Sequence, residues 1–424
     1  MRIKRIIIDF MRLLPLFLAL STVFIINREL ANGVVTAKYF WFYASMAVAG
    51  VATLITVVIC KPQFRFTVTD FLVLLFVGCV LLSSLVINDA GQNTTKLTLF
   101  MLLAVLYFCA RLLVCSDDAK IETIVCFFIV VGGLVQAVWG LRQLYGFVPS
   151  QHALFKLTGS FFNPGPYAGY LAVVFPLALH FALRTVCIEN VRGLFVKVIS
   201  VITCIAIILT LPAAMSRASW LAVGASVLVV LAGHYYHKFS HIKNYLRAHR
   251  KKSVIAAIVV TILFFGAFAG MYHIKRDSAD GRALMWKMAI HAAAQNPFGV
   301  GLGNFSAAYG EAQAAYFAAG KGSETEEHVA GSPDYGFNEY LQIAVETGIV
   351  SLIIFLAIVV LSLKSLIKNQ KWGIVGSILS LLVFAFFSYP FSVLPFLIVF
   401  VILLALNEKN EELRMKNEEL RIKR

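Results

Sequence analysis

The chain has 424 residues, of which 60% are hydrophobic and only 14% are charged, and its mean hydropathy is +0.82. A soluble globular domain is about half apolar and about a quarter charged, so these values exclude an ordinary soluble protein. The net charge of +15 would suggest nucleic acid in a soluble protein. In a membrane protein, Lys and Arg instead orient helices and contact anionic headgroups, so we expect membrane lipids and no nucleic acid as partners.

The apolar residues fall in runs of about 18 to 22, the length that crosses roughly 30 Å of hydrocarbon. Met1–Arg5 is basic and leads into the first run without a convincing cleavage site, so we expect an uncleaved span. We predict an all-α polytopic membrane protein with about 12 transmembrane helices. Only a turn at Ser388–Pro390 separates the last two, which form two spans or one broken hairpin. The expected spans are 8–27, 39–60, 69–88, 97–115, 121–141, 165–186, 195–214, 218–235, 253–273, 345–366, 373–388 and 389–407.

The basic residues predict the orientation. With a cytoplasmic N-terminus, about 26 of the 37 Lys and Arg residues lie inside and about 11 outside; the densest inside stretch is His237–Lys252. Both termini are then cytoplasmic. We divide the chain into transmembrane helices 1–9 (residues 1–273), a large and partly helical periplasmic loop (274–344), helices 10–12 (345–407) and a charged tail (408–424). The tail repeats KNEELRM as KNEELRI, which is typical of a solvated segment or of a short coiled-coil helix.

The spacing of the cysteines and the absence of common catalytic motifs argue against several functions. The seven cysteines lie in or beside apolar runs without CxxC spacing, so we interpret them as small buried apolar residues. The sequence has no P-loop, GxGxxG, HExxH or GxSxG motif. We therefore expect no ATP hydrolysis, no nicotinamide chemistry and no cofactor.

Two arginines are candidates for an anion site. Arg217 stands in a tight bend between two apolar spans, where it either snorkels to headgroups or contacts an anion such as phosphate. Arg282 begins the first helix-like part of the large loop, where the helix dipole disfavours a cation unless it faces an anion; the alternative is a solvated loop residue. Arg276 makes this region more positive, and Trp286 is spaced on the same helix face as Arg282.

Acidic and histidine residues of the large loop are less specific. Glu324, Glu326 and Glu327 match no calcium loop, so we interpret them as a solvated turn without a metal. His328 could act as a general base near neutral pH, although a surface role is also consistent with its position.

Several motifs occur together in one order. They are GSFFNPGPYAGYLA at 159–172, SRASWLA at 216–222, GRALMWKMAIHAAAQNPFGVGLGNF at 281–305, and FNEYLQIAVETGIVSLIIF at 337–355. This ordered set resembles the O-antigen ligase/polymerase superfamily over roughly residues 145–366. Elsewhere the chain agrees with that family in topology alone.

The resemblance implies a bacterial inner-membrane glycosyltransferase that transfers a glycan from undecaprenyl diphosphate to an acceptor hydroxyl on the periplasmic face. The O-antigen ligase type, with lipid A–core as acceptor in lipopolysaccharide biosynthesis, is our first expectation. Polymerases of the repeat unit and protein O-oligosaccharyltransferases are alternatives within the superfamily. Arg217 and Arg282 resemble the positions that hold the diphosphate, and no metal is then required.

The resemblance also implies the other site residues, with one departure. Ligases of the family commonly carry a histidine before the asparagine of the Asn-x-Tyr-Leu motif, whereas this chain has Phe337. Another group must serve as the base (His328, Glu339 or Tyr335), or base assistance is small, or the branch is not the ligase. We predict catalytic roles for Arg217, Arg282, Asn338 and His328, and substrate-binding roles for Arg217, Arg282, Arg276, Trp286, Asn163 and Tyr340.

Two other classes of function compete with this interpretation. A transporter of lipid-linked glycans needs ionisable residues at membrane depth, and the predicted spans have almost none away from their ends. A non-catalytic scaffold in envelope assembly would tolerate loss of both arginines.

Overall fold

The computed structural model describes residues 2–62, 64–87, 91–114, 119–184, 191–236 and 276–406. Its described segments are helical or irregular, without a strand, which confirms the all-α prediction. The predicted span at 253–273, the basic stretch from His237 to Lys252 and the tail at 408–424 lie outside the described residues. The helices and their bounds are α1 (Arg2–Ser21), η1 (Thr22–Phe24), α2 (Gly33–Cys60), α3 (Val68–Leu82), η2 (Ser83–Ile87), α4 (Thr94–Val114), α5 (Ala119–Leu144), α6 (Pro164–Leu183), α7 (Val191–Thr210), α8 (Arg217–His234), α11 (Arg276–Gln295), α12 (Phe305–Ala318), α13 (Glu324–Val329), α14 (Glu339–Thr347), α15 (Ile349–Lys368), α16 (Trp372–Phe387), η4 (Pro390–Ser392) and α17 (Leu394–Ala405).

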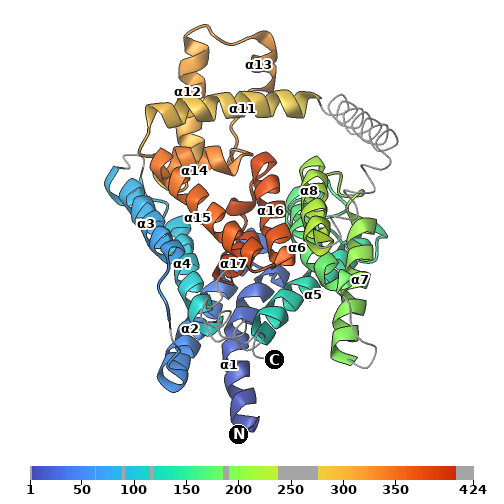
Figure 1. Ribbon diagram of the computed structural model, residues 1–424. Helices are drawn as coiled ribbons and strands as arrows, with labels where there is room; N and C mark the ends of the chain where they lie inside the picture. Colours follow the sequence, from blue (N-terminus) through green and yellow to red (C-terminus); the bar gives the residue numbers. More distant parts are fainter. Residues whose placement is uncertain are drawn as a thin grey trace, which may run out of the picture.

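The long apolar helices run up and down in one bundle (Figure 1). Among the described residues, nine helices are long and apolar enough to cross a membrane, and α16 and α17 are shorter apolar helices. The chain is therefore a multi-pass membrane protein. Helix α11 lies across one end of the bundle, with α12 and α13 beside it (Figure 1); we call this end the loop side.

Helix α6 is the centre of the bundle. It is 78% buried, whereas the α3 segment Val68–Ile87 is 22% buried. Small residues allow its neighbours to approach: a Cβ on Gly169 would lie 2.3 Å from the Phe384 ring of α16. The Ser377 and Ser380 hydroxyls of α16 each donate to an α6 carbonyl at 2.7 Å. Close backbones and interhelical hydrogen bonds are the usual means of helix association in lipid.

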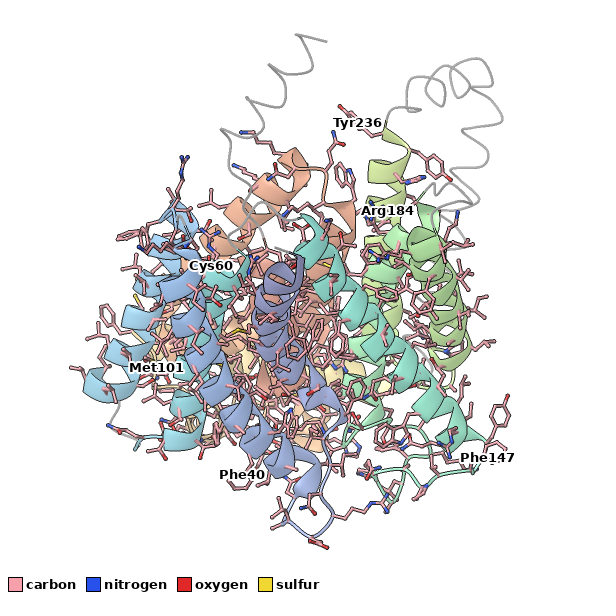
Figure 2. The ribbon with its side chains drawn as sticks, turned by 90° about the horizontal axis from the view of Figure 1, so that it is seen from below. Phe40, Cys60, Met101, Phe147, Arg184 and Tyr236 are labelled. Atoms are coloured by element: carbon pink, nitrogen blue, oxygen red, sulfur yellow. The ribbon has the colours of Figure 1, made fainter. Side chains whose placement is uncertain are left out.

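The flanks of the bundle differ from its centre. Seen from below, α2–α4 (blue) and α7–α8 (green) lie on opposite flanks (Figure 2). On the first flank, a buried polar group joins α3 to α4, because Asp70 accepts from Arg111 at 2.9 Å and from Tyr107 at 2.8 Å. Thr67 and Asp70 also form a capping box that begins α3.

The large loop is fastened to the bundle by backbone hydrogen bonds. The predicted span at 345–366 is instead two helices, because Gly348 has φ of +93° and ends α14 before α15 begins. At this break the Ile349 N–H donates to the Pro297 carbonyl at 3.0 Å, and the Gly301 N–H donates to the Glu346 carbonyl at 2.8 Å. Gly299, Gly301 and Gly303 all have positive φ, a conformation that glycine adopts without steric cost.

A second set of contacts ties the loop helices together. The Lys287 ammonium of α11 lies 2.8 Å from the Glu326 carboxylate of α13 and 4.4 Å from the Tyr316 ring centroid of α12. Glu326 also completes a capping box with Ser323. The acidic run that we interpreted as solvated therefore contains one residue that pairs three helices.

Candidate functional site

Arg217 is presented by a strained bend on the loop side. The bend follows α7, and Met215 in it has φ of +47°, which is uncommon for a residue with a side chain. The Trp220 indole N–H donates to the Leu211 carbonyl at 3.2 Å and so holds the bend to α8. Arg217 is then the first residue of α8, where the positive end of the helix dipole and the guanidinium both favour an anion.

Arg282 is brought to the same site from α11. Burial lowers the pKa of Arg282 first, and the positive charge of Arg217 lowers it further. The two guanidinium groups are therefore close enough to repel each other. Two like charges held together repel each other and favour an anion between them.

An aromatic surface lies under Arg282. Its guanidinium carbon is 5.4 Å from the Phe337 ring centroid, a cation–π distance. Tyr389 packs edge-on against Phe337 at 5.0 Å and stacks on Tyr335 at 4.5 Å. We call Arg217, Arg282, Phe337 and Tyr389 the arginine site.

Phe337 is held in a conformation that bulky residues rarely adopt. Its φ is +48°, which costs of order 1–3 kcal/mol and persists only when the surroundings impose it. On one side the Gly336 N–H donates to the Gln342 side chain at 3.0 Å. On the other side the Asn338 carbonyl oxygen of the side chain accepts from the Tyr340 and Leu341 N–H groups at 3.1 and 3.2 Å. The ring is thus directed at Arg282, in the position where the family resemblance implies a histidine.

Trp286 lies one helical turn after Arg282 and provides an unused donor. Its ring packs against Phe386 at 5.3 Å and Phe387 at 6.3 Å, at the end of α16. Its buried indole N–H has no hydrogen-bond partner among the residues that the structure describes. A buried donor without a partner is rare in native structures, and a bound ligand is one explanation. Arg276 begins α11, but its side chain lies outside the described residues.

The other predicted site residues have different surroundings. Asn338 caps α14 as described above. Tyr340 donates its hydroxyl to the Leu382 carbonyl at 3.0 Å and so joins α14 to α16. Asn163 caps α6 by accepting from the Gly165 N–H at 2.9 Å. His328 is exposed on α13. Each of the first three therefore has a structural hydrogen bond that explains its side chain.

Sequence reasoning did not find Tyr389. The turn at Ser388–Pro390 was interpreted only as a break between two apolar spans, and the structure confirms that break. The signal was a tyrosine in the one polar interruption of a long apolar run. Its neighbours Tyr335 and Arg282 are far away in sequence, so no local pattern connects them.

Part of the chain matches a known protein family. Residues 202–356 match the family model described as O-antigen ligase. Over these residues the chain is similar to the O-antigen ligase superfamily. This confirms the predicted resemblance, and members of the family are glycosyltransferase-like enzymes. The match contains Arg217, Arg282 and Phe337, whereas Tyr389 lies beyond it. The search of curated proteins found no match.

Proposed function

We propose that this protein is a membrane glycosyltransferase of the O-antigen ligase superfamily that moves a glycan from undecaprenyl diphosphate to an acceptor hydroxyl. The observation that carries the proposal is the pair of arginines on the loop side: Arg217 is the first residue of α8, and its guanidinium lies close enough to the half-buried Arg282 of α11 to interact with it. Two guanidinium groups offer bidentate hydrogen bonds to the oxygens of a diphosphate. The loop side then faces the periplasm of a bacterial inner membrane, and both termini face the cytoplasm.

The proposed step needs positive charge on the leaving group. The acceptor oxygen attacks the anomeric carbon of the glycan, and the bond from this carbon to the diphosphate oxygen breaks. The electron pair of that bond goes to the diphosphate, whose growing negative charge Arg217 and Arg282 stabilise. Fixed donors aimed at developing charge commonly provide the largest part of such catalysis. The unpartnered Trp286 N–H is a further donor for the same anion.

The acceptor proton needs a different route from the one that a histidine would provide. Phe337 binds Arg282 through its ring face and accepts no proton. A base at His328 or Tyr335, or release of the proton to water with little assistance, are the routes consistent with this site; Glu339, the third candidate, is buried with its pKa raised to about 8, so it is mostly protonated near neutral pH. We favour the ligase type with lipid A–core as acceptor; the phenylalanine at position 337 keeps the polymerase and the protein O-oligosaccharyltransferase as alternatives.

The proposed function is tested by profiling glycans after deletion of the gene in its host, with the wild type and Arg282→Ala as complementing genes. A ligase or protein glycosyltransferase predicts full-length polymer stranded on undecaprenyl diphosphate, and the missing glycoconjugate identifies the acceptor. A polymerase predicts single repeat units on the finished product. An unchanged profile would contradict the proposal and favour a transporter of lipid-linked glycans or a scaffold.

A second experiment tests the absence of a metal from the proposed reaction. We expect transfer by the purified protein in lipid nanodiscs to proceed at an unchanged rate in EDTA, because the arginines supply the positive charge. Loss of transfer in EDTA that Mg²⁺ or Mn²⁺ restores would contradict this part of the proposal.

A further inference from the structure

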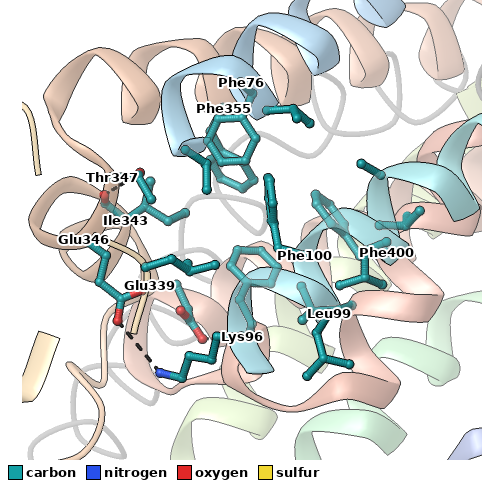
Figure 3. Close-up of a pocket in the computed structure, with 18 of the residues that line it drawn as sticks. Phe76, Lys96, Leu99, Phe100, Glu339, Ile343, Glu346, Thr347, Phe355 and Phe400 are labelled. Carbon is teal, nitrogen blue, oxygen red and sulfur yellow. Dashed lines mark hydrogen bonds and ion pairs between the residues drawn. The ribbon is translucent and has the colours of Figure 1, made fainter. Parts of the chain in front are cut away.

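A cavity of about 220 Å³ lies on the opposite flank from Arg217. Its walls come from α3, α4, α14, α15, α17 and the turn at 390–392 (Figure 3). Helices α3 and α4 follow each other in the chain but pack little against each other, because α3 packs on α15 and α4 packs on α17. The cavity therefore lies among membrane-crossing helices, between two neighbours that the fold keeps apart.

The cavity extends about half-way through a membrane. It reaches from Lys96 near the loop-side end of α4 to Tyr107 on the same helix. These residues are eleven positions apart, which corresponds to about 16 Å of helix and roughly half of a 30 Å hydrocarbon core. Between them the walls are apolar, with Phe76, Phe100, Phe355 and Phe400 facing the space (Figure 3). A depth of this size suits one hydrocarbon chain from the loop-side leaflet.

The loop-side end of the cavity is polar. Helix α14 presents one face to it, formed by Glu339, Gln342, Ile343, Glu346 and Thr347. Glu346 lies 4.0 Å from the Lys96 ammonium. Glu339 accepts from the Phe391 N–H at 2.6 Å. Burial raises the pKa of Glu339 to about 8, so this carboxyl group is mostly protonated near neutral pH and can donate a hydrogen bond as well as accept one.

We propose that this cavity binds one acyl chain of the acceptor lipid, with a hydroxyl-bearing part of its headgroup at Glu339 and Gln342. The inference rests on the proposed function and identifies where the second substrate binds. Charge decides between the two substrates: the cavity's cation, Lys96, is paired with Glu346 at 4.0 Å, so the cavity offers no excess positive charge for a diphosphate. Carboxyl and amide groups instead suit hydroxyl groups, which both donate and accept hydrogen bonds.

The polar end of the cavity is close to the arginine site along the chain and in space. Glu339 is two residues after Phe337, which contacts Arg282. The Glu339 carboxyl group holds the turn that also carries Tyr389, two residues before Phe391. A donor on the arginines and an acceptor in the cavity would thus approach the beginning of α14 from opposite flanks. Glu339 is a positioning residue in this arrangement, because it holds the turn between the two sites.

The test is photolabelling of the full chain in phosphatidylethanolamine nanodiscs. The probe is dodecyl glucoside with a diazirine near the end of its chain, which has one alkyl chain and a hydroxylated head. We expect labelled peptides from α3 and α4 at cavity-lining positions. We expect unlabelled dodecyl glucoside to compete for this labelling and dodecyl phosphate to compete at least about tenfold less well. Both competitors carry the same chain, so the difference between them measures the effect of the headgroup.

A matched pair of variants separates the cavity from the lipid-facing surface. Ala104 lines the cavity, whereas the side chain of its neighbour Val105 is 46% exposed on the surface of the protein. Ala104→Trp fills the cavity and should lower the labelling at least about tenfold, because each excluded methylene weakens binding by about fourfold. Val105→Trp should label as the wild type does. Ala104→Leu, a smaller change, should lower the labelling by about fourfold if Ala104→Trp does not fold.

The outcomes distinguish this inference from the proposed function, since labelling needs no turnover. Labelling confined to lipid-facing residues, equal competition by dodecyl phosphate, or equal labelling of Ala104→Leu and the wild type would overturn the inference. If the arginine variants still lose transfer in that case, the proposed function stands without it. If labelling behaves as expected and the arginine variants transfer normally, the cavity binds a lipid but the proposed function fails.

Discussion

The arginine site and the cavity between α3 and α4 carry opposite chemistry at two flanks of the same helix, α14. The arginine site gathers two cations and an aromatic surface, and Arg217 lowers the pKa of Arg282. The cavity gathers two carboxyl groups and apolar walls. In the proposed account the excess positive charge of the first site suits a diphosphate, whereas the second site, whose cation Lys96 is paired with Glu346, suits a hydroxylated lipid. Donor and acceptor would then bind at different places and meet at the beginning of α14.

The two sites also differ in packing. The arginine site borders α16, which packs on the 78% buried α6 through small residues and serine hydrogen bonds. The cavity borders α3, of which 22% is buried. A tightly packed flank holds charges in a fixed geometry, as catalysis requires, whereas a loosely packed flank leaves room for a flexible chain.

The largest expected effect is loss of transfer on removing either arginine. Arg217→Ala and Arg282→Ala should each lower the transfer rate by about 10²–10³, the range for removing one donor from a developing anion. The double variant should be little worse than the worse single variant, because both act on one diphosphate. Transfer from a lipid-linked donor in nanodiscs measures this.

Lys321→Ala is the matched control for the arginines, since Lys321 is an exposed cation in the same loop, and it should transfer normally. If the losses of transfer caused by the two arginine substitutions simply add in the double variant, the two arginines act at separate places.

The next effect concerns the acidic site and its pH dependence. The folded-state pKa of Glu339 is raised to about 8 by burial, while the unfolded chain has an ordinary glutamate. Between about pH 5 and pH 8 the folded state retains a proton that the unfolded state has lost. Stability should therefore fall as pH rises through this window, by up to roughly 1.4 kcal/mol per pH unit, and Glu339→Gln should flatten the fall. Melting temperatures of both proteins at half-unit pH steps measure it; parallel curves would contradict the account.

A smaller effect is expected for the ring under Arg282. Phe337→Leu removes the cation–π contact, which is worth about 0.5–2 kcal/mol, and should weaken donor binding by about 2- to 30-fold. Phe337→Tyr retains the ring face and should bind the donor as the wild type does. Equal weakening by both variants would indicate that the backbone at this position matters rather than the ring.

The smallest effect is expected for Trp286→Phe. The indole N–H has no hydrogen-bond partner in the described part of the chain, so its removal should leave the melting temperature unchanged or slightly higher. If the N–H donates to the diphosphate, donor binding should weaken by a few-fold, as for one neutral hydrogen bond. A lower melting temperature with unchanged donor affinity would assign this side chain to packing alone.

Much of the fold follows from the sequence because lipid imposes a simple rule. Long apolar runs must be helices, and within the described residues the helix bounds agree with the predicted spans to within six residues, except at Gly348, where a glycine with positive φ divides one run. Arg217 was selected because a charge in a bend between two apolar spans has few ordinary explanations. Arg282 was selected as a cation at the start of a helix, although α11 begins six residues earlier, at Arg276. Phe337 stood out as a departure from the family pattern. Its contact with Arg282 could not be predicted, because the two residues are 55 positions apart in the chain.

The cavity could not be predicted for a physical reason. Residues that face lipid and residues that face an apolar cavity have the same composition, so Phe76 and Phe100 look like any other membrane-facing residues in sequence. The polar end was also concealed, since Glu339 and Glu346 lie on one face of a short helix whose first half falls outside the predicted span. His328 illustrates the reverse: its residue type suggested a base, whereas it lies exposed on α13.

The most direct test of the central proposal is equilibrium binding of undecaprenyl diphosphate to the purified protein in nanodiscs, with undecaprenyl monophosphate as the reference ligand. The account predicts that the wild type prefers the diphosphate, that Arg217→Ala and Arg282→Ala each lose this preference, and that the double variant loses no more. Equal binding of the diphosphate by the wild type and both single variants would contradict the assignment of this site to the donor.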